Sequence, residues 1–119
     1  MKIILDTNFL MAVTQFKIDV FTQLRGNELY TIDKVVDELV KHSKTKAKKA
    51  SAAKVALKLV ESKGLKVLLS KENDTDTALL EYSKNGYCIA TQDRLLLDQI
   101  KKSGSKAIYI RQKKYLLIK

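Results

Sequence analysis

Short apolar runs rich in β-branched residues alternate with longer segments of helical periodicity, and this alternation restricts the fold more than any other feature. In the intervening segments apolar residues recur at helical spacing, as Val35 and Leu39 do. Strands that alternate with helices are typical of βαβ units joined into a parallel sheet. We therefore expect an α/β fold with one open sheet of five mainly parallel strands. The runs that predict these strands are 2–5, 28–32, 65–69, 87–91 and 106–110.

Chain length and glycine placement indicate one domain. The 119 residues suffice for one hydrophobic core and are too few for two, so we expect residues 1–119 to form a single domain. The cationic stretch KHSKTKAKK at 41–49 is interpreted as a joint between two helices. Each glycine precedes an expected strand, where the end of a helix favours a left-handed residue. These glycines are Gly26, Gly64, Gly86 and Gly104.

Cysteine usage and hydropathy indicate the compartment. One cysteine cannot form an internal disulfide, which favours a reduced, cytoplasmic location. No apolar run approaches the roughly 18 residues of a membrane span. The first run is also much shorter than the core of a signal peptide. We therefore expect a cytoplasmic protein with no membrane partner.

The charge balance predicts a polyanionic partner. Lys and Arg number 23 against 13 Asp and Glu, a net charge of +10. General solubility or thermal adaptation is the alternative explanation. Between 41 and 66 the only acid is Glu61, and Lys54 and Lys58 share a helix face there that suits phosphate contacts or is simply solvated. A second basic segment around Arg111 lies beside Tyr109, an aromatic ring that stacks on unpaired bases or belongs to the core.

Carboxylates occur where the predicted strands end. Asp6 directly follows the first strand, Asp93 follows the fourth by two residues, and Asp76 begins the helix after the third. Parallel strands share one carboxyl edge, where ligands of such sheets bind. Glu38 borders the buried stripe of the helix after the second strand and can reach the same edge. Acids brought together repel one another unless a cation is present, and Mg²⁺ or Mn²⁺ prefers such oxygen ligands.

Helix capping is the alternative explanation for the aspartates. Aspartate is among the preferred N-caps, because its carboxylate accepts hydrogen bonds from the first free amides of a helix. The joint pattern, with Asn8 and Thr91 as short polar side chains at the same edge, leaves a metal site and a set of caps equally open. The residues that capping would explain are Asp6, Asp74 or Asp76, and Asp93.

Four segments together resemble the motifs of PIN-domain nucleases: ILDTNFL at 4–10, VVDEL at 35–39, DTALLEYS at 76–83 and IATQD at 89–93. The resemblance covers nearly the whole chain and implies a three-layer α/β/α fold and a metal-dependent ribonuclease that uses Mg²⁺ or Mn²⁺. It implies that Asn8 and Thr91 support the site by hydrogen bonds. The acids that it assigns to catalysis and metal binding are Asp6, Glu38, Asp76 and Asp93.

The third motif departs from the family, because Thr77 follows Asp76 where relatives often have a second aspartate. One metal ion is therefore favoured over two. More narrowly, AAKVALKL at 52–59 and AIYIRQKKYL at 107–116 resemble the small archaeal PIN proteins related to the endonucleases that process small-subunit ribosomal RNA.

That narrower resemblance implies an endoribonuclease acting in ribosomal RNA processing, with RNA and a ribosome-assembly protein as partners. Two alternatives remain open. One is a toxin nuclease paired with an antitoxin protein, and the other is a weakly active or inactive PIN-fold factor that binds RNA during assembly. The resemblance also implies that a second copy of the chain is a candidate partner, as a homodimer.

Overall fold

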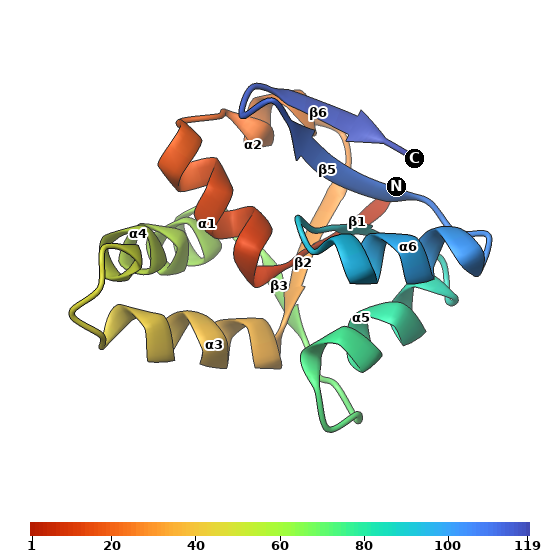
Figure 1. The fold of residues 1–119 in the computed structure, drawn as a ribbon, viewed down its shortest axis with the longest axis horizontal. Helices are drawn as coiled ribbons and strands as arrows, with labels where there is room; N and C mark the ends of the chain where they lie inside the picture. The colour runs from red at the N-terminus through yellow and green to blue at the C-terminus, as the bar shows by residue number, and fades with distance from the viewer.

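The computed structural model describes residues 1–119 and has six strands and six helices (Figure 1). The strands are β1 (Lys2–Leu5), β2 (Glu28–Ile32), β3 (Lys66–Leu68), β4 (Tyr87–Ala90), β5 (Ala107–Arg111) and β6 (Tyr115–Ile118). The helices are α1 (Thr7–Phe16), α2 (Val20–Gln23), α3 (Asp33–Ser43), α4 (Lys49–Ser62), α5 (Thr75–Ser83) and α6 (Arg94–Lys102).

The strands form one sheet in the order β3-β2-β1-β4-β5-β6. Every neighbouring pair is parallel except β5 and β6, which are antiparallel. From β1 the chain first moves outward through β2 to β3, then returns to β4 on the other side of β1. The order therefore reverses between β1 and β4, and open α/β sheets bind their ligands beyond the carboxyl ends of the strands at such a reversal.

Helices cover the sheet on both faces, so the expected three-layer α/β/α sandwich is confirmed. Helices α1, α3 and α4 pack against one another on one side, and α5 packs against α6 on the other (Figure 1). Right-handed crossovers require this division, because the two halves of the chain move across the sheet in opposite directions. The central strands are buried accordingly: Ile3, Ile4 and Leu5 of β1 and Ile89 of β4 are fully inaccessible to solvent.

The glycines fulfil their expected role, since all four have positive φ angles. Gly86, for example, has a φ of 91° between the end of α5 and the start of β4. A left-handed residue here ends the helix and turns the chain into the strand.

The expected strand count of five was wrong, because a sixth strand pairs with β5 at the edge of the sheet. Strand β6 (Tyr115–Ile118) runs antiparallel to β5, with Arg111 opposite Tyr115. The turn between them places Gln112 at a φ of 55° and Lys113 at a φ of 57°. Two consecutive left-handed residues are typical of hairpin turns, which usually carry Asn-Gly or Asp-Gly there. Glutamine and lysine hide that signal, so the sequence alone does not indicate a hairpin.

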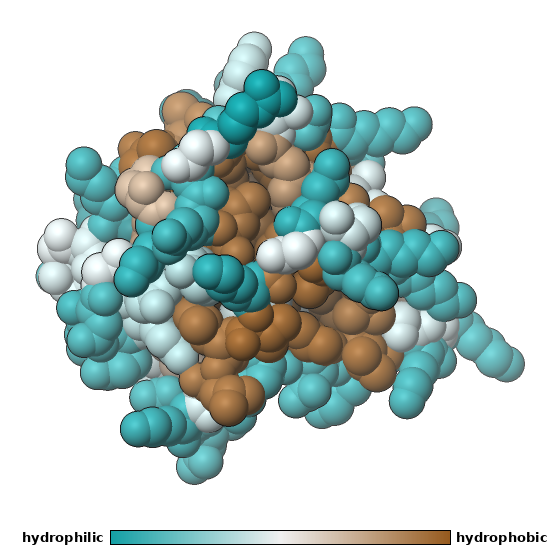
Figure 2. Space-filling model, turned by 180° about the vertical axis from the view of Figure 1, so that it is seen from behind, coloured by the Kyte–Doolittle hydropathy of each residue, from teal (hydrophilic) through white to brown (hydrophobic).

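The face opposite the view of Figure 1 has hydrophobic residues gathered over its middle, with hydrophilic side chains around them (Figure 2). Large apolar side chains remain exposed at several places on the molecule, and Leu69, just beyond the edge strand β3, is 78% exposed. None of the helices combines the length and the apolar character that crossing a membrane requires.

The turn between β5 and β6 predicts a stabilising substitution. Lys113→Gly should raise the free energy of unfolding by about 0.5–1 kcal/mol, because glycine adopts a positive φ without the steric cost of a Cβ atom. Denaturant unfolding followed by circular dichroism measures the change. The matched control is Lys58→Gly on the exposed side of α4, which should instead lower stability by about 1 kcal/mol. A loss of stability in both variants would contradict the prediction.

Candidate active site

The four acids singled out by the sequence line one pocket at the carboxyl edge of the sheet. The pocket has a volume of about 210 Å³ and lies where β1 and β4 end side by side. Each acid comes from a different part of the chain: between β1 and α1, on α3, on α5, and just before α6. These acids are Asp6, Glu38, Asp76 and Asp93.

Asp6 is the most deeply buried of the four, with only 4% of its surface exposed. Its backbone amide donates to the carbonyl of Ala90 in β4 at 2.9 Å. One carboxylate oxygen accepts from the amide of Thr7 and the other from the hydroxyl of Thr91, each at 2.7 Å. Burial raises the pKa of Asp6 to about 6, and the charges of Glu38 and Asp76 add to this rise, whereas the two hydrogen bonds lower it. Asp6 therefore caps α1 and lines the pocket at the same time.

Glu38 is held between two threonine hydroxyls. Thr7 donates to one carboxylate oxygen at 2.6 Å, and Thr75 donates to the other. These threonines are the first residues of α1 and α5, so Glu38 joins three helices at the pocket. These two hydrogen bonds fix the orientation of its carboxylate. Thr7 also links Glu38 to Asp6, because its backbone amide donates to Asp6.

The third motif contains two aspartates with different roles. Asp74 caps α5 by accepting from the amide of Thr77 at 3.1 Å and from its hydroxyl at 2.6 Å. Asp76 instead lines the pocket with the other three acids. Burial raises the pKa of Asp76, and the charges of Asp93, Asp74 and Glu38 contribute to the rise. Asp74 is therefore the helix cap, and Asp76, two residues later, is the pocket acid.

The loop after β4 is bonded to three parts of the molecule. Asp93 caps α6, accepting from the amides of Leu95 at 2.9 Å and Leu96 at 3.2 Å. Its own amide donates to the hydroxyl of Thr91 at 3.1 Å, the same hydroxyl that bonds Asp6. The side-chain oxygen of Asn8 accepts from the amide of Gln92 at 3.0 Å. Thr91 and Asn8 thus connect the Asp93 loop to Asp6 and the start of α1.

The side chain of Gln92 fastens this loop to β5. Its carboxamide nitrogen donates to the carbonyl of Ile110 at 3.1 Å, and its carboxamide oxygen accepts from the amide of Ile110 at 2.6 Å. This pair of bonds replaces the contacts that a strand neighbour would make with Ile110. Gln92 lies inside the fourth motif, but its role was not predicted.

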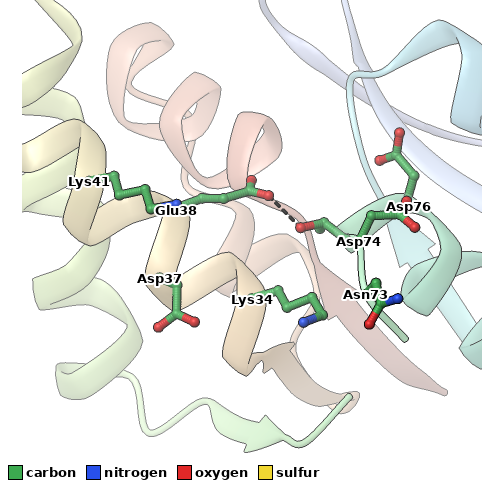
Figure 3. Close-up of a pocket in the computed structure, with 8 residues that line it drawn as sticks. Lys34, Asp37, Glu38, Lys41, Asn73, Asp74 and Asp76 are labelled. Atoms are coloured by element: carbon green, nitrogen blue, oxygen red, sulfur yellow. Dashed lines mark hydrogen bonds between the residues drawn. The ribbon is translucent and has the colours of Figure 1, made fainter. Parts of the chain in front are cut away.

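Basic side chains surround the acids. His42 and Lys49 line the same pocket, on the side of α3 and α4. A second hollow of about 460 Å³ adjoins it between α3 and α5, where Lys34 and Lys41 stand among the acids, which here include Asp37 and Asp74 (Figure 3). Figure 3 shows Glu38 reaching from α3 toward the start of α5, whereas Asp37 points away from it. Lys54 and Lys58, which share a face of α4, line neither hollow.

Comparison with known proteins identifies the family. A profile described as "PIN like domain" matches residues 3–113. This chain belongs to the PIN-domain family. It is 30% identical over 127 residues to Ribonuclease VapC4 of Methanocaldococcus jannaschii, an alignment that spans 98% of this chain and 95% of the relative.

A solved structure shares the fold of this PIN domain. A domain of a functionally unknown protein from Methanocaldococcus jannaschii superimposes with a TM-score of 0.67 and 15% sequence identity. The match covers 92% of this chain and 91% of that domain. At this level of identity the likeness concerns the fold alone.

The donor set of this PIN domain suits a hard divalent ion. The four acids offer only oxygen ligands, and Asp6 and Asp76 carry raised pKa values that a bound cation would lower. No three acidic, histidine or cysteine side chains stand close enough in this structure to enclose an ion by themselves. Mg²⁺ does not require such a cage, because it keeps several waters and often binds one or two carboxylates together with a substrate phosphate.

The two residues that hold Glu38 were also not predicted. Thr7 and Thr75 hold Glu38, yet their hydroxyls resemble ordinary polar side chains at a helix start. A signal was present, because each follows the aspartate that caps its helix: Asp6 precedes Thr7 and Asp74 precedes Thr75. The repeated Asp-Thr pair marks two helix starts at the same edge.

The raised pKa of Asp6 predicts an unusual pH dependence of stability. In the unfolded chain this carboxyl ionises at its usual pKa of 3.8, and in the fold at about 6. Its stabilising contribution is therefore complete below pH 4 and is lost as the pH rises through 6. Asp6→Asn removes the charge and keeps an acceptor for the Thr7 amide. At pH 8 it should raise the free energy of unfolding by up to about 3 kcal/mol, at 1.36 kcal/mol per pKa unit.

Urea unfolding in EDTA at pH 4, 6 and 8 measures this effect, and the gain should disappear at pH 4. The control is Asp19→Asn at the start of α2, because hydrogen bonds from the side chain and amide of Thr22 lower the pKa of Asp19. Its contribution has the opposite sign, present at pH 8 and lost as the pH falls, so that variant should be destabilised at pH 8. Destabilisation of both variants at pH 8 would contradict the interpretation of Asp6.

Proposed function

We propose that this PIN domain is a divalent-metal-dependent endoribonuclease. The observation that carries the proposal is the convergence of Asp6, Glu38, Asp76 and Asp93 on one pocket at the reversal of strand order. Family membership and the 30% identity to a protein named as a ribonuclease support a nuclease. The net charge of +10 supports a polyanionic substrate.

Asp6, Asp76 and Asp93 would hold Mg²⁺ or Mn²⁺, directly or through water. When bound, such an ion lowers the pKa of coordinated water and neutralises charge that develops on a phosphoryl group. The two hydrogen bonds that Asp6 accepts, and the positive amino end of α1, favour its charged form against the effect of burial.

Glu38 would orient the attacking water. Each of its oxygens accepts one threonine hydroxyl, and a carboxylate oxygen has a second lone-pair direction available for water. Because the threonines fix the carboxylate, the water that it accepts from is also fixed relative to Asp6. A fixed nucleophile lowers the entropic part of the barrier.

The cations around the pocket would hold the substrate. Lys49 lines the pocket itself, and Lys34 and Lys41 line the hollow beside it. Positive charges at these places would bind the phosphates on either side of the scissile bond, since Lys and Arg supply most phosphate contacts in nucleic-acid complexes. A basic surface around an acidic pocket thus separates substrate binding from metal binding.

Cleavage assays with variants test this proposal. Fluorescent single-stranded and structured RNAs are incubated with the wild type in Mg²⁺, Mn²⁺ or EDTA. We expect cleavage with either metal and none in EDTA.

Asp6→Asn and Asp93→Asn should each reduce the rate at least 100-fold, and Glu38→Gln should reduce it by a smaller factor. The matched control is Glu81→Gln, an exposed glutamate of α5 away from the pocket, which should cleave at the wild-type rate. Equal residual cleavage in all variants would indicate a contaminant and end the enzyme proposal.

The RNA that is cut distinguishes the remaining roles. Ribosomal RNA processing requires one position in a precursor ribosomal RNA, whereas a toxin cuts mature cellular RNA and is silenced by an antitoxin protein. Sequencing the new 5′ ends after incubation with total RNA separates the two. A single precursor site is expected for processing, and recurrent cuts in mature RNAs for a toxin. Binding of RNA without any cleavage would favour the assembly-factor role. Size-exclusion chromatography of the same sample tests whether the chain forms a homodimer.

A further inference from the structure

A third hollow lies between α6 and β5. It has a volume of about 700 Å³ and we call it the α6–β5 groove. Figure 1 shows α6 running beside the β5–β6 hairpin. One side of the groove is a stripe of α6, residues 94, 97, 98 and 101, and the other is β5, residues 107 and 109–111. The spacing on α6 places its four side chains on one face of that helix, and residues 107, 109 and 111 share one face of β5.

The groove is strongly basic. Its charged side chains are Arg94 and Lys101 of α6, Arg111 of β5 and Lys119, opposed by one acid, Asp98. One aromatic side chain, the half-buried Tyr109, lines it as well. The ammonium of Lys119 lies over the ring of Tyr109, 5.7 Å from the ring centre.

The groove leads to the acids of the pocket. Gln92 lines the groove, and the oxygen and nitrogen of its carboxamide bond the backbone of Ile110 in β5. The next residue, Asp93, lines the carboxylate pocket, and the one after it, Arg94, lines the groove. From Ala107 to Arg111 the groove follows β5 for about 13 Å, at 3.3 Å per residue. A chain of phosphates lying along β5 would therefore arrive at Asp93.

We propose that the α6–β5 groove binds single-stranded RNA next to the scissile bond, with phosphates on Lys101 and Arg111 and a base on Tyr109. This inference rests on the proposed ribonuclease function and extends it to a substrate path. Arginine and lysine along a groove with an aromatic ring are the combination by which proteins bind single strands without reading their sequence.

Binding without metal tests the groove separately from cleavage. Fluorescence anisotropy with a labelled 12-nucleotide single-stranded RNA is measured in EDTA, where no cleavage is expected. Lys101→Glu with Arg111→Glu should weaken binding at least 10-fold. The double variant should also reduce the slope of log affinity against log salt by more than 1, because single strands contribute about 0.7 per phosphate contact. Should the charge reversals prevent folding, Lys101→Gln with Arg111→Gln gives the same test in milder form.

The matched control reverses two charges on the rival basic surface, Lys54→Glu with Lys58→Glu on α4. It changes the net charge equally and should alter affinity less than 3-fold. Tyr109→Leu should weaken binding at least 5-fold with an unchanged salt slope, whereas Tyr109→Phe, which keeps the ring, should bind like the wild type. Equal weakening by both charge-reversed pairs, or retained binding by the Lys101 and Arg111 variant, would overturn the proposal.

The test also separates this proposal from its foundation. If the Lys101 and Arg111 variant still binds RNA and cleaves it with metal, the groove is wrong and the ribonuclease stands. If wild-type cleavage fails while the groove variants lose binding, the groove stands as part of an RNA-binding factor. A labelled acidic peptide of equal charge is the final probe, and its binding as tightly as the RNA would assign the groove to a protein and overturn the RNA assignment.

Discussion

The buried carboxylate of Asp6 is the interaction on which the site depends. It lies at the junction of the two central strands, and its partners come from the start of α1 and the end of β4. A charge placed where water is largely excluded needs hydrogen bonds, and here those bonds fix the relative positions of both segments. Thr7 passes the constraint on to Glu38, and Thr91 passes it on to Asp93. One desolvated charge thus positions residues from four separate parts of the chain.

The distribution of charge follows from that arrangement. The acids occupy the narrow place where the strand order reverses, and the cations stand on the helices and the outer strand around it. Each group therefore meets a different ligand: the acids repel phosphates and attract a metal ion, and the cations do the opposite. In the proposed function, a polynucleotide would be held along the rim and would reach the centre only where a cation has neutralised the acids.

Most of this architecture could be predicted from the sequence, because its signals are local. The alternation of apolar runs and helical stripes predicted the parallel strands, and the position of each aspartate after a strand or before a helix predicted the shared edge. The sixth strand could not be predicted, since Gln112 and Lys113 adopt left-handed conformations that their residue types disfavour. The contacts of Glu38 could not be predicted either, because its threonine partners lie 31 and 37 residues away and depend on how three helices pack.

The side chain of Gln92 has a mechanical consequence. Both polar atoms of the side chain bond the backbone of Ile110. The β5–β6 hairpin therefore helps to hold the loop that carries Asp93. Fraying of β5 and β6 would remove this attachment of the loop and leave those to Asp6, Asn8 and α6. Changes in the hairpin would then reach Asp93 through one side chain, without loss of the core. Sequence changes in the β5–β6 hairpin can therefore shift the position of Asp93, although that hairpin contains none of the four acids.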